Sequence, residues 1–370
     1  MIETKNLFTF LKKEKINFFT GVPDSVLKET SSFLEKKNKL DHYIATNEGS
    51  AVAMAIGYNL ATKKIPCIYM QNSGLGNAIN PLISIAHKKV YSIPHLLMIG
   101  WRGSPGSKDE PQHEVKGKIT INILKLLNIP HCIINQKKDL KKLKKLINLA
   151  KSKNIPVACL IKKNVLKDSD KKKSKKLKIN SNVKRKDIIE NLLKNIKIKS
   201  KIIATTGFTS RELNQIRQIN KEKKGDDFYM VGGMGHSSMV ALGVSMKTKS
   251  DVICLDGDGS FLMHLGSIVN IGKIQRKNFK HILFNNFTHE SVGGQTTNID
   301  NVKIRELVKS VGYKNYLKVN RVKQINKSLQ KFLNQSGPSF LEIKINQGSI
   351  KDLKRPKNFL SIKRNFIKSF

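Results

Sequence analysis

The sequence predicts two α/β domains, each a doubly wound parallel sheet, and three observations support this fold class. Short apolar runs of strand length alternate with amphipathic segments of helix length along almost the whole chain, which is typical of parallel strands joined by crossover helices. The 370 residues exceed the roughly 250–300 that one core usually fills, and 39% of them are hydrophobic. A lysine-rich stretch near the middle has too few apolar residues to bury a face. We therefore expect a first domain over residues 1–165, a linker over 166–184 and a second domain over 185–370.

The expected elements follow from the alternation of apolar runs and amphipathic segments. The strands expected in the first half cover residues 17–20, 42–45, 66–70, 94–99, 131–134 and 156–161. Those in the second half cover residues 201–204, 228–230, 252–255, 281–284, 316–318 and 339–345. Helices expected between the first-half strands cover residues 25–36, 49–62, 77–86, 117–127 and 140–152.

The formal net charge of +42 raises the question of nucleic-acid binding. Nine of the cationic residues are arginines, and arginine is the residue most favoured for bidentate recognition of bases and phosphates. The 60 lysines are spread over expected helix faces and loops, as in a solvated surface whose field attracts small anions. We expect no nucleic-acid partner; a basic arm in the lysine-rich stretch is the alternative.

The four cysteines indicate a reducing compartment. Cys67, Cys132, Cys159 and Cys254 lie far apart, each inside an apolar run, without the CxxC spacing of a zinc site. No run reaches the ~18–20 apolar residues of a membrane span, and the N-terminal segment lacks the hydrophobic core of a signal peptide. We therefore expect a cytoplasmic protein with no membrane partner.

The most specific local signal is the segment DVICLDGDGSFLMHLGSIVNIGKIQRKNFKHILFNN. A strand is expected to end at Asp256, followed by a turn over residues 257–260, a helix to about Gln275 and a second strand ending at Asn286. A right-handed crossover would place Asp258 and Asn286 at the carboxyl ends of neighbouring parallel strands, where open α/β sheets bind ligands.

The side chains at these strand ends suit a magnesium ion. Asp258 offers a carboxylate oxygen, Asn286 an amide oxygen and Thr288 its main-chain carbonyl, which are the hard ligands that Mg²⁺ prefers. Diphosphate oxygens and water would complete the octahedron.

The glycines of the same turn suit a diphosphate. Gly257 and Gly259 allow a sharp turn and a close approach of the ligand, and the amides beginning at Ser260 face the anion. A tight turn with a capping aspartate is the alternative interpretation of the GDG triplet alone.

This arrangement resembles the cofactor motif of the thiamin diphosphate-dependent 2-oxo acid decarboxylases. The resemblance implies the thiamin diphosphate-binding fold in both domains, with thiamin diphosphate and Mg²⁺ as cofactors. It also implies that Met234, between Gly233 and Gly235 in VGGMGHSSMVALG, props the cofactor into a bent shape. A buried core methionine is the alternative for Met234.

The resemblance further implies an activating glutamate from the first domain type. Glu48, in IATNEGSAVAMAIGYNLATKK, lies at the start of an expected helix and would hydrogen-bond the aminopyrimidine ring of the cofactor. A carboxylate that merely complements the helix dipole is the alternative.

Several residues near other strand ends are candidates for binding an anionic 2-oxo acid. Arg102 offers a planar guanidinium, with a surface arginine stacked on Trp101 as the alternative. The other substrate-binding candidates are Asp24 and Ser25, which could equally be helix caps, and Asn72, Lys108, Glu290 and Ser291. His113 and His289 are candidate proton carriers, although loop histidines are often only hydrogen-bonding groups.

The segments TGVPDS, MQNSGLGNAINPL and GWRGSPGSKDEPQHEVKG, each after an expected strand of the first domain, resemble those of the phosphonopyruvate decarboxylases within this family. That resemblance implies a carboxy-lyase of phosphonate biosynthesis that converts 3-phosphonopyruvate to phosphonoacetaldehyde and CO₂. It also implies self-association, at least a homodimer, with each site completed at a subunit interface. The alternatives are sulfopyruvate decarboxylase, another thiamin-dependent decarboxylase or carboligase and, more distantly, a non-catalytic nucleic-acid-binding protein.

Overall fold

The computed structural model describes residues 1–36, 40–167, 181–221 and 223–370. The chain divides into two compact units, the first containing residues 1–176 and 292–295 and the second residues 177–291 and 296–370. Most of the expected linker lies outside the described residues. Its first two residues, Leu166–Lys167, form a short strand, β8, which pairs in parallel with β1, Ile2–Glu3.

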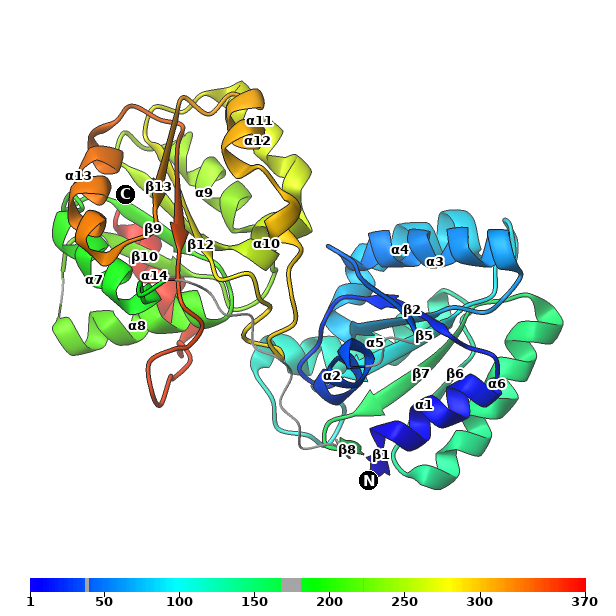
Figure 1. Cartoon of the computed structure of the whole chain (residues 1–370). Coiled ribbons are helices and arrows are strands. Elements are labelled where there is room, and N and C mark those ends of the chain that lie inside the picture. Colours follow the sequence, from blue (N-terminus) through cyan, green and yellow to red (C-terminus); the bar gives the residue numbers. More distant parts are fainter. Residues whose placement is uncertain (37–39, 168–180, 222) are drawn as a thin grey trace. The chain divides into compact units, whose positions relative to one another are not determined.

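The first unit is built on a six-stranded parallel sheet with the order β3-β2-β4-β5-β7-β6 (Figure 1). Its interior strands are apolar along almost their whole length because helices cover both faces. The strands are β2 (Phe18–Gly21), β3 (Asp41–Ile44), β4 (Cys67–Gln71), β5 (Leu96–Trp101), β6 (His131–Ile134) and β7 (Val157–Lys162).

Two hydrophobic layers flank this sheet. One contains residues of α1 (Thr4–Lys13), α2 (Lys28–Glu35) and α6 (Leu140–Lys153). The other contains residues of α3 (Glu48–Thr62), α4 (Leu75–Pro81) and α5 (Pro111–Leu126). The unit is therefore doubly wound, as the sequence predicts.

The second unit repeats this architecture with the strand order β10-β9-β11-β12-β14-β13, again all parallel. The strands are β9 (Lys201–Ala204), β10 (Asp226–Tyr229), β11 (Val252–Gly257), β12 (Phe279–Asn285), β13 (Asn315–Val319) and β14 (Ser339–Lys344).

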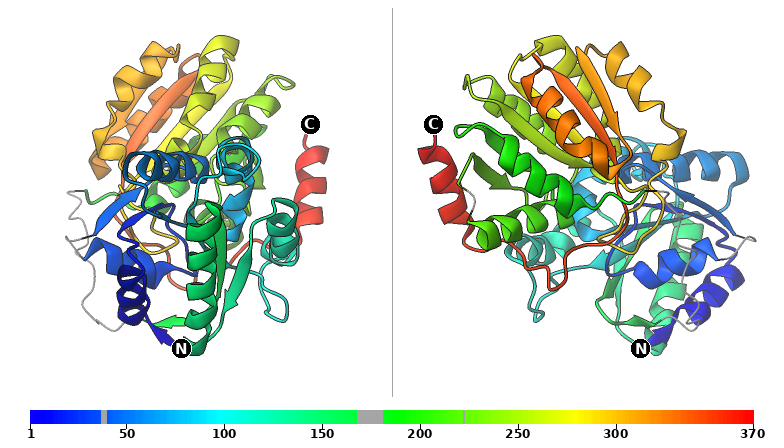
Figure 2. Two further views of the ribbon diagram at one scale, coloured as in Figure 1. Left: turned by 90° about the vertical axis from the view of Figure 1, so that its right-hand side faces the viewer. Right: turned by 60° about the vertical axis from the view of Figure 1, so that its left-hand side comes forward.

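Helices also cover both faces of the second sheet (Figure 2). One layer contains residues of α7 (Arg185–Asn195), α8 (Phe208–Asn220) and α13 (Ile325–Asn334). The other contains residues of α9 (Ser237–Ser245), α10 (Asp258–Met263), α11 (Ile268–Ile274), α12 (Ile304–Ser310) and α14 (Phe359–Lys368).

Several expected helices differ in their bounds from those observed; α2, for example, begins at Lys28 and not at residue 25. α5 begins at Pro111, six residues before the expected start, because proline suits the first helical position. The helix expected after the GDGS turn is interrupted, since His264 leaves the helical conformation between α10 and a 3₁₀ turn at Leu265–Ser267. Because α5 begins at Pro111, His113 lies in the first turn of that helix and not in a loop.

The structure is consistent with the expected state of the cysteines, since all four carry free thiols. Among the described residues, none of the helices has both the length and the apolar character needed to span a bilayer.

Candidate active site

Asp258 and Asn286 follow two neighbouring strands of the second unit. β11 ends at Gly257 and β12 at Asn285, and the two strands pair directly in parallel. Both side chains are buried, with exposed fractions of 3% and 4%. The prediction that these two parts of the motif meet at one edge of the sheet is confirmed.

Asp258 is a buried acid held by several donors. Its Oδ1 accepts a hydrogen bond from the Gly259 amide over 2.8 Å, and its Oδ2 accepts one from the Thr297 hydroxyl over 3.3 Å. Burial raises the pKa of Asp258 to about 7, although these bonds and the charge of Arg185 act in the opposite direction. A cation beside such an acid would favour its ionised form.

The Asn286 amide is bonded at both ends. Its Nδ2 donates to Oε2 of Glu290 over 2.9 Å, and its Oδ1 accepts from the Thr288 amide over 3.1 Å. Phe287, between them, has a φ of 60°, in a region that is uncommon for residues other than glycine. Such backbone outliers cluster at functional sites.

Glu290 is engaged by groups of its own unit. Besides Asn286, its carboxylate accepts hydrogen bonds from Arg185 over 2.9 Å and from the Gly348 amide. Arg185 also pairs with Glu212 over 3.4 Å, and both of these side chains are almost fully buried. The carboxylate expected to contact substrate is thus occupied by protein donors.

Met234 and His289 converge on Gly259. A Cβ atom on Gly259 would lie 2.7 Å from the His289 ring and 3.2 Å from Cε of Met234, so only glycine fits there. Gly233 and Gly235 have φ values of 63° and 88°, which glycine adopts without strain. The residues expected to hold the cofactor in this unit are thus close together.

Ser260 joins the Met234 segment to the GDGS turn. Its hydroxyl accepts a hydrogen bond from the Gly235 amide over 3.1 Å and forms another with the Thr205 hydroxyl over 2.9 Å.

His289 is buried, and this burial lowers its pKa to about 4, so the ring is neutral near pH 7.

The residues of this edge fit a diphosphate with a divalent cation. Asp258 and Asn286 place buried oxygen atoms at the ends of adjacent strands, and a Cβ on Gly257 would meet nothing within 4 Å. Hard oxygen ligands suit Mg²⁺, and the open space beside them would admit phosphate oxygens bound to that ion.

A second group of potential ligand atoms, from Cys254, Asp256 and His281, lies in the core of the same unit. Nδ1 of His281 is engaged by the Tyr313 hydroxyl, 2.9 Å away, whereas its Nε2 lies 3.4 Å from Asp256 without a hydrogen bond. Burial raises the pKa of the Cys254 thiol well above its usual value, which leaves a protonated and poor metal ligand.

Glu48 is the first residue of α3 in the first unit, and 6% of it is exposed. Its Oε2 accepts a hydrogen bond from Nδ2 of Asn77 over 2.8 Å. A Cβ on Gly74 would overlap the carboxylate of Glu48, so this position accommodates only glycine unless the acid moves. The carboxylate is therefore confined by two residues of the NSGLGN segment.

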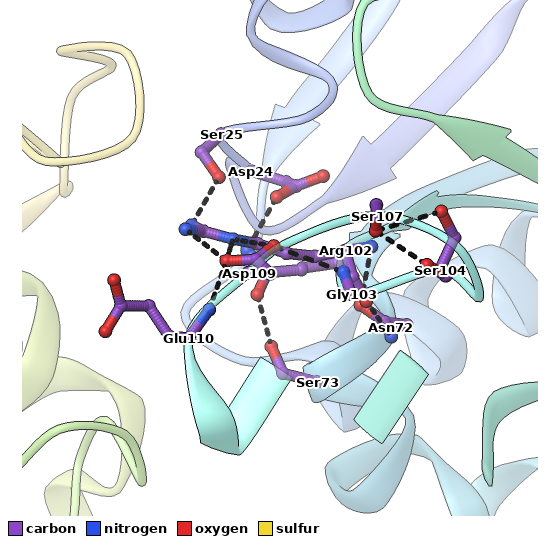
Figure 3. A network of polar contacts seen from close by, with 11 residues as sticks. Asp24, Ser25, Asn72, Ser73, Arg102, Gly103, Ser104, Ser107, Asp109 and Glu110 are labelled. Atoms are coloured by element: carbon purple, nitrogen blue, oxygen red, sulfur yellow. Dashed lines mark hydrogen bonds and ion pairs between the residues drawn. The ribbon is translucent and has the colours of Figure 1, made fainter. Parts of the chain in front are cut away.

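Arg102 lies just beyond the carboxyl end of β5, and its guanidinium is held by the side chains of Asp109 and Ser25 (Figure 3). Its Nε lies 3.0 Å from Oδ2 of Asp109 and its Nη2 lies 3.1 Å from Oδ1, which makes the pair bidentate. Its Nη1 donates to the Ser25 hydroxyl over 3.1 Å. Burial opposes the charged form of Asp109, but the bonds and charge of Arg102 outweigh it and hold the pKa of Asp109 below its usual range.

Asn72 fixes the main chain of Arg102. Its Oδ1 accepts from the Arg102 amide over 3.1 Å, and its Nδ2 donates to the Arg102 carbonyl over 2.9 Å and to the Thr120 hydroxyl over 2.9 Å. Trp101 is buried and donates to the Gly117 carbonyl, so it packs away from the guanidinium–carboxylate pair of Arg102.

Asp24 follows the carboxyl end of β2 and is fully buried. Its Oδ1 accepts from Nε2 of Gln71 over 2.7 Å and its Oδ2 accepts from the Leu27 amide over 3.2 Å. Burial raises the pKa of Asp24 to about 6 despite these bonds.

Residues 71–77 hold three candidates at once: Gln71 holds Asp24, Asn72 holds Arg102 and Asn77 holds Glu48.

The remaining candidates are Lys108, Ser291 and His113. Lys108 and Ser291 are exposed, and the Ser291 hydroxyl lies 3.4 Å from where a Cβ on Gly207 would be. His113 is partly buried, and its carbonyl packs against Gly103.

The residues of these networks that the sequence did not predict include Gln71, Asn77, Asp109 and Arg185. Gln71 and Asn77 lie in a segment rich in amide side chains directly after a strand, and Asp109 lies in the Arg102 loop. Arg185 carried no local signal, because its two acidic partners are far away in the chain.

Comparison with protein families finds two matches in the order of the two units. Residues 4–123 match the N-terminal TPP (thiamine pyrophosphate, or thiamin diphosphate) binding domain of thiamine pyrophosphate enzymes. Residues 205–343 match the C-terminal TPP binding domain of the same enzymes. The phosphonopyruvate decarboxylase of Streptomyces viridochromogenes is 30% identical, over 96% of this chain and 92% of that protein. The chain belongs to the thiamine pyrophosphate-dependent decarboxylases.

Other relatives of this thiamine pyrophosphate-dependent decarboxylase differ in their named substrate. The sulfopyruvate decarboxylase of Methanosarcina acetivorans is 26% identical, over 82% of this chain and 81% of that protein. The sulfopyruvate decarboxylase subunit beta of Methanocaldococcus jannaschii is 35% identical, over 35% of this chain and 66% of that subunit. The expected family, enzyme class and fold are confirmed.

Proposed function

We propose that this enzyme decarboxylates 3-phosphonopyruvate to phosphonoacetaldehyde and CO₂, with thiamin diphosphate and Mg²⁺ as cofactors, in phosphonate biosynthesis. The observation that carries this choice is the similarity to a phosphonopyruvate decarboxylase across 96% of the chain. Arg102 supports it, because Nη1 and Nη2 each have a second N–H beyond those bonded to Ser25 and Asp109, which suits a substrate that carries a carboxylate and a phosphonate.

In the second unit, Asp258, Asn286 and the carbonyl of Thr288 would hold Mg²⁺. The open space at Gly257 and the absence of a side chain at Gly259 would admit the diphosphate. Met234, beside Gly259, would contact the cofactor and support it.

In the first unit, Glu48 would hydrogen-bond the pyrimidine ring, held in place by Asn77. When bound, thiamin diphosphate supplies the carbon nucleophile and the electron sink that make loss of CO₂ possible. His113 and His289 are the groups that we propose to move protons, His289 from its neutral form. Arg102 and Ser25 would orient the anionic end of the substrate.

We propose that the half-sites of Glu48 and Asp258 come together between two copies of the chain, so that a homodimer is the smallest active form. Mixing inactive Glu48→Gln and Asp258→Asn chains tests this, because one of the two sites in a mixed dimer keeps both native residues. Regained aldehyde production is the expected result. Activity that stays absent after subunit exchange, with mixed dimers demonstrated, would contradict a shared site.

The activity itself is tested with purified protein, thiamin diphosphate, Mg²⁺ and 3-phosphonopyruvate, by following phosphonoacetaldehyde with an aldehyde-specific readout. No aldehyde from the native chain would refute the assignment.

Sulfopyruvate is the second candidate substrate, favoured by the similarity to a sulfopyruvate decarboxylase over 82% of the chain. Its sulfonate carries one negative charge where the phosphonate carries up to two. Comparing kcat/KM for the two acids decides between them, and we expect the larger value for 3-phosphonopyruvate.

A further inference from the structure

The carboxylate of Glu290 is a junction between separate parts of the second unit. It accepts hydrogen bonds from Arg185, the first residue of α7, from Asn286 after β12, and from the Gly348 amide after β14. Both carboxylate oxygens are therefore engaged, Oε2 by two donors and Oε1 by one. An anionic substrate would be repelled by this acid, which argues for a role other than substrate binding.

Arg185 fixes the position of this carboxylate. Only 5% of its side chain is exposed, and it is paired with Glu290 over 2.9 Å and with Glu212 over 3.4 Å. A guanidinium buried between two acids cannot move to solvent without leaving them unpaired. Glu290 is consequently held from α7 while its other donors come from the loops of the site.

The partners of Asn286 determine which end of its amide points where. Oε2 of Glu290 accepts hydrogen bonds from Arg185 and from Asn286, so the atom of Asn286 that faces it is the amide nitrogen. The Thr288 backbone N–H only donates, so the atom facing it must be the amide oxygen. Turning the amide over would place two donors against each other and two acceptors against each other.

We propose that Glu290, held by Arg185, is a positioning residue that orients the Asn286 amide so that its oxygen, and not its nitrogen, is presented to the metal ion. The inference rests on the proposed role of Asn286 as a Mg²⁺ ligand. An amide nitrogen has no free lone pair for Mg²⁺, so the orientation of this amide decides whether the ligand exists.

The test is calorimetric titration of thiamin diphosphate into the full-length protein at a series of Mg²⁺ concentrations. Glu290→Met removes the acceptor and keeps an unbranched side chain. We expect the Mg²⁺ concentration for half-maximal cofactor binding to rise about 10–100-fold, the usual effect of losing a residue that orients a metal ligand. Saturating Mg²⁺ should restore cofactor affinity.

Glu212→Met is the matched control, because it also removes a carboxylate from Arg185 and does not touch Asn286. The Mg²⁺ concentration that Glu212→Met needs for half-maximal cofactor binding should stay within about twofold of the native value, which is small beside the about 10–100-fold rise expected for Glu290→Met. An unchanged requirement in Glu290→Met, or an equal rise in both variants, would overturn the proposal in favour of a structural ion pair.

If Glu290→Met does not fold, Glu290→Gln replaces it. Its single oxygen can serve the Gly348 amide or the Arg185–Asn286 pair but not both, so a smaller rise in the Mg²⁺ requirement is expected and no rise overturns the proposal. Failure of the native chain to bind thiamin diphosphate with Mg²⁺ would instead refute the proposed function.

Discussion

Asn77 donates a hydrogen bond to Oε2 of Glu48 over 2.8 Å, from a position 29 residues further along the chain. An acid that must bond a cofactor ring through one oxygen benefits when its other oxygen is fixed by the protein. Asn77 supplies a support of this kind for Glu48.

We predict that Asn77→Ala lowers kcat by about 10–100-fold, because a hydrogen bond to a charged group contributes ~1.5–3 kcal/mol. Steady-state kinetics at saturating thiamin diphosphate and Mg²⁺ measures this. Asn80→Ala is the control, since Asn80 lies on the same helix and is exposed. Equal kcat values for both variants would show that Glu48 needs no support from Asn77.

Gly74 and Gly76 make a second matched pair. A Cβ on Gly74 would overlap the Glu48 carboxylate, whereas a Cβ on Gly76 would meet nothing within 4 Å. We predict that Gly74→Ala abolishes most turnover by displacing Glu48. Gly76→Ala should keep full turnover and raise the free energy of unfolding by roughly 0.5–1 kcal/mol, because alanine is the better helix former. Urea unfolding with parallel activity assays checks both variants. A fully active Gly74→Ala would contradict the expectation that a Cβ at this position displaces the Glu48 carboxylate.

Much of the fold follows from local patterns in the sequence. β6 and β9 have the expected bounds because each is a continuous apolar run between polar turns. The start of α5 was misplaced because the residues before it, rich in glycine, proline and charge, give no amphipathic signal. β1 and β8 were missed because two-residue strands have no periodicity.

The site was predictable where a motif is contiguous. Asp258 and Asn286 belong to one strand–helix–strand unit, so chain topology alone brings them to adjacent strand ends. The bonds of Arg185 to Glu290 and of Asn77 to Glu48 join residues 105 and 29 positions apart, and no local pattern specifies such pairs. Contacts that orient side chains therefore required the folded structure.

Arg102 is the residue on which we expect recognition of the substrate head group to depend. A lysine has one compact donor group and cannot bond Asp109 twice while also reaching Ser25. We predict that Arg102→Lys raises KM for 3-phosphonopyruvate by about 10–100-fold with a smaller change in kcat, because charge-assisted hydrogen bonds contribute ~1.5–3 kcal/mol.

Lys108→Met is the control for general charge, because Lys108 is an exposed cation in the same loop. Its KM should change little at physiological ionic strength, where exposed charges are screened. If Lys108→Met raises KM as much as Arg102→Lys does, attraction by the loop as a whole, and not the guanidinium, recognises the anion.

Asp24 should make the free energy of unfolding depend on pH. Burial raises its pKa from 3.8 to about 6, so the folded state disfavours the ionised carboxylate. The group is protonated in both states below pH 3.8, and the fold loses stability as pH rises from there through about 6. Asparagine does not titrate, so Asp24→Asn should gain stability relative to the native chain on going from about pH 4.5 to about pH 8, by about 2 kcal/mol.

Asp139 is the counterpart of Asp24 with the opposite sign. Hydrogen bonds from the Asn135 and Gln136 amides and the ion pair with Lys142 lower the pKa of Asp139, so its contribution to stability is present at neutral pH and lost as the pH falls. Asp139→Asn should therefore lose stability mainly at the higher pH, where Asp24→Asn gains it. Urea unfolding of the two variants and the native chain at both pH values measures this, and shifts of the same sign in both variants would exclude burial of Asp24 as the cause.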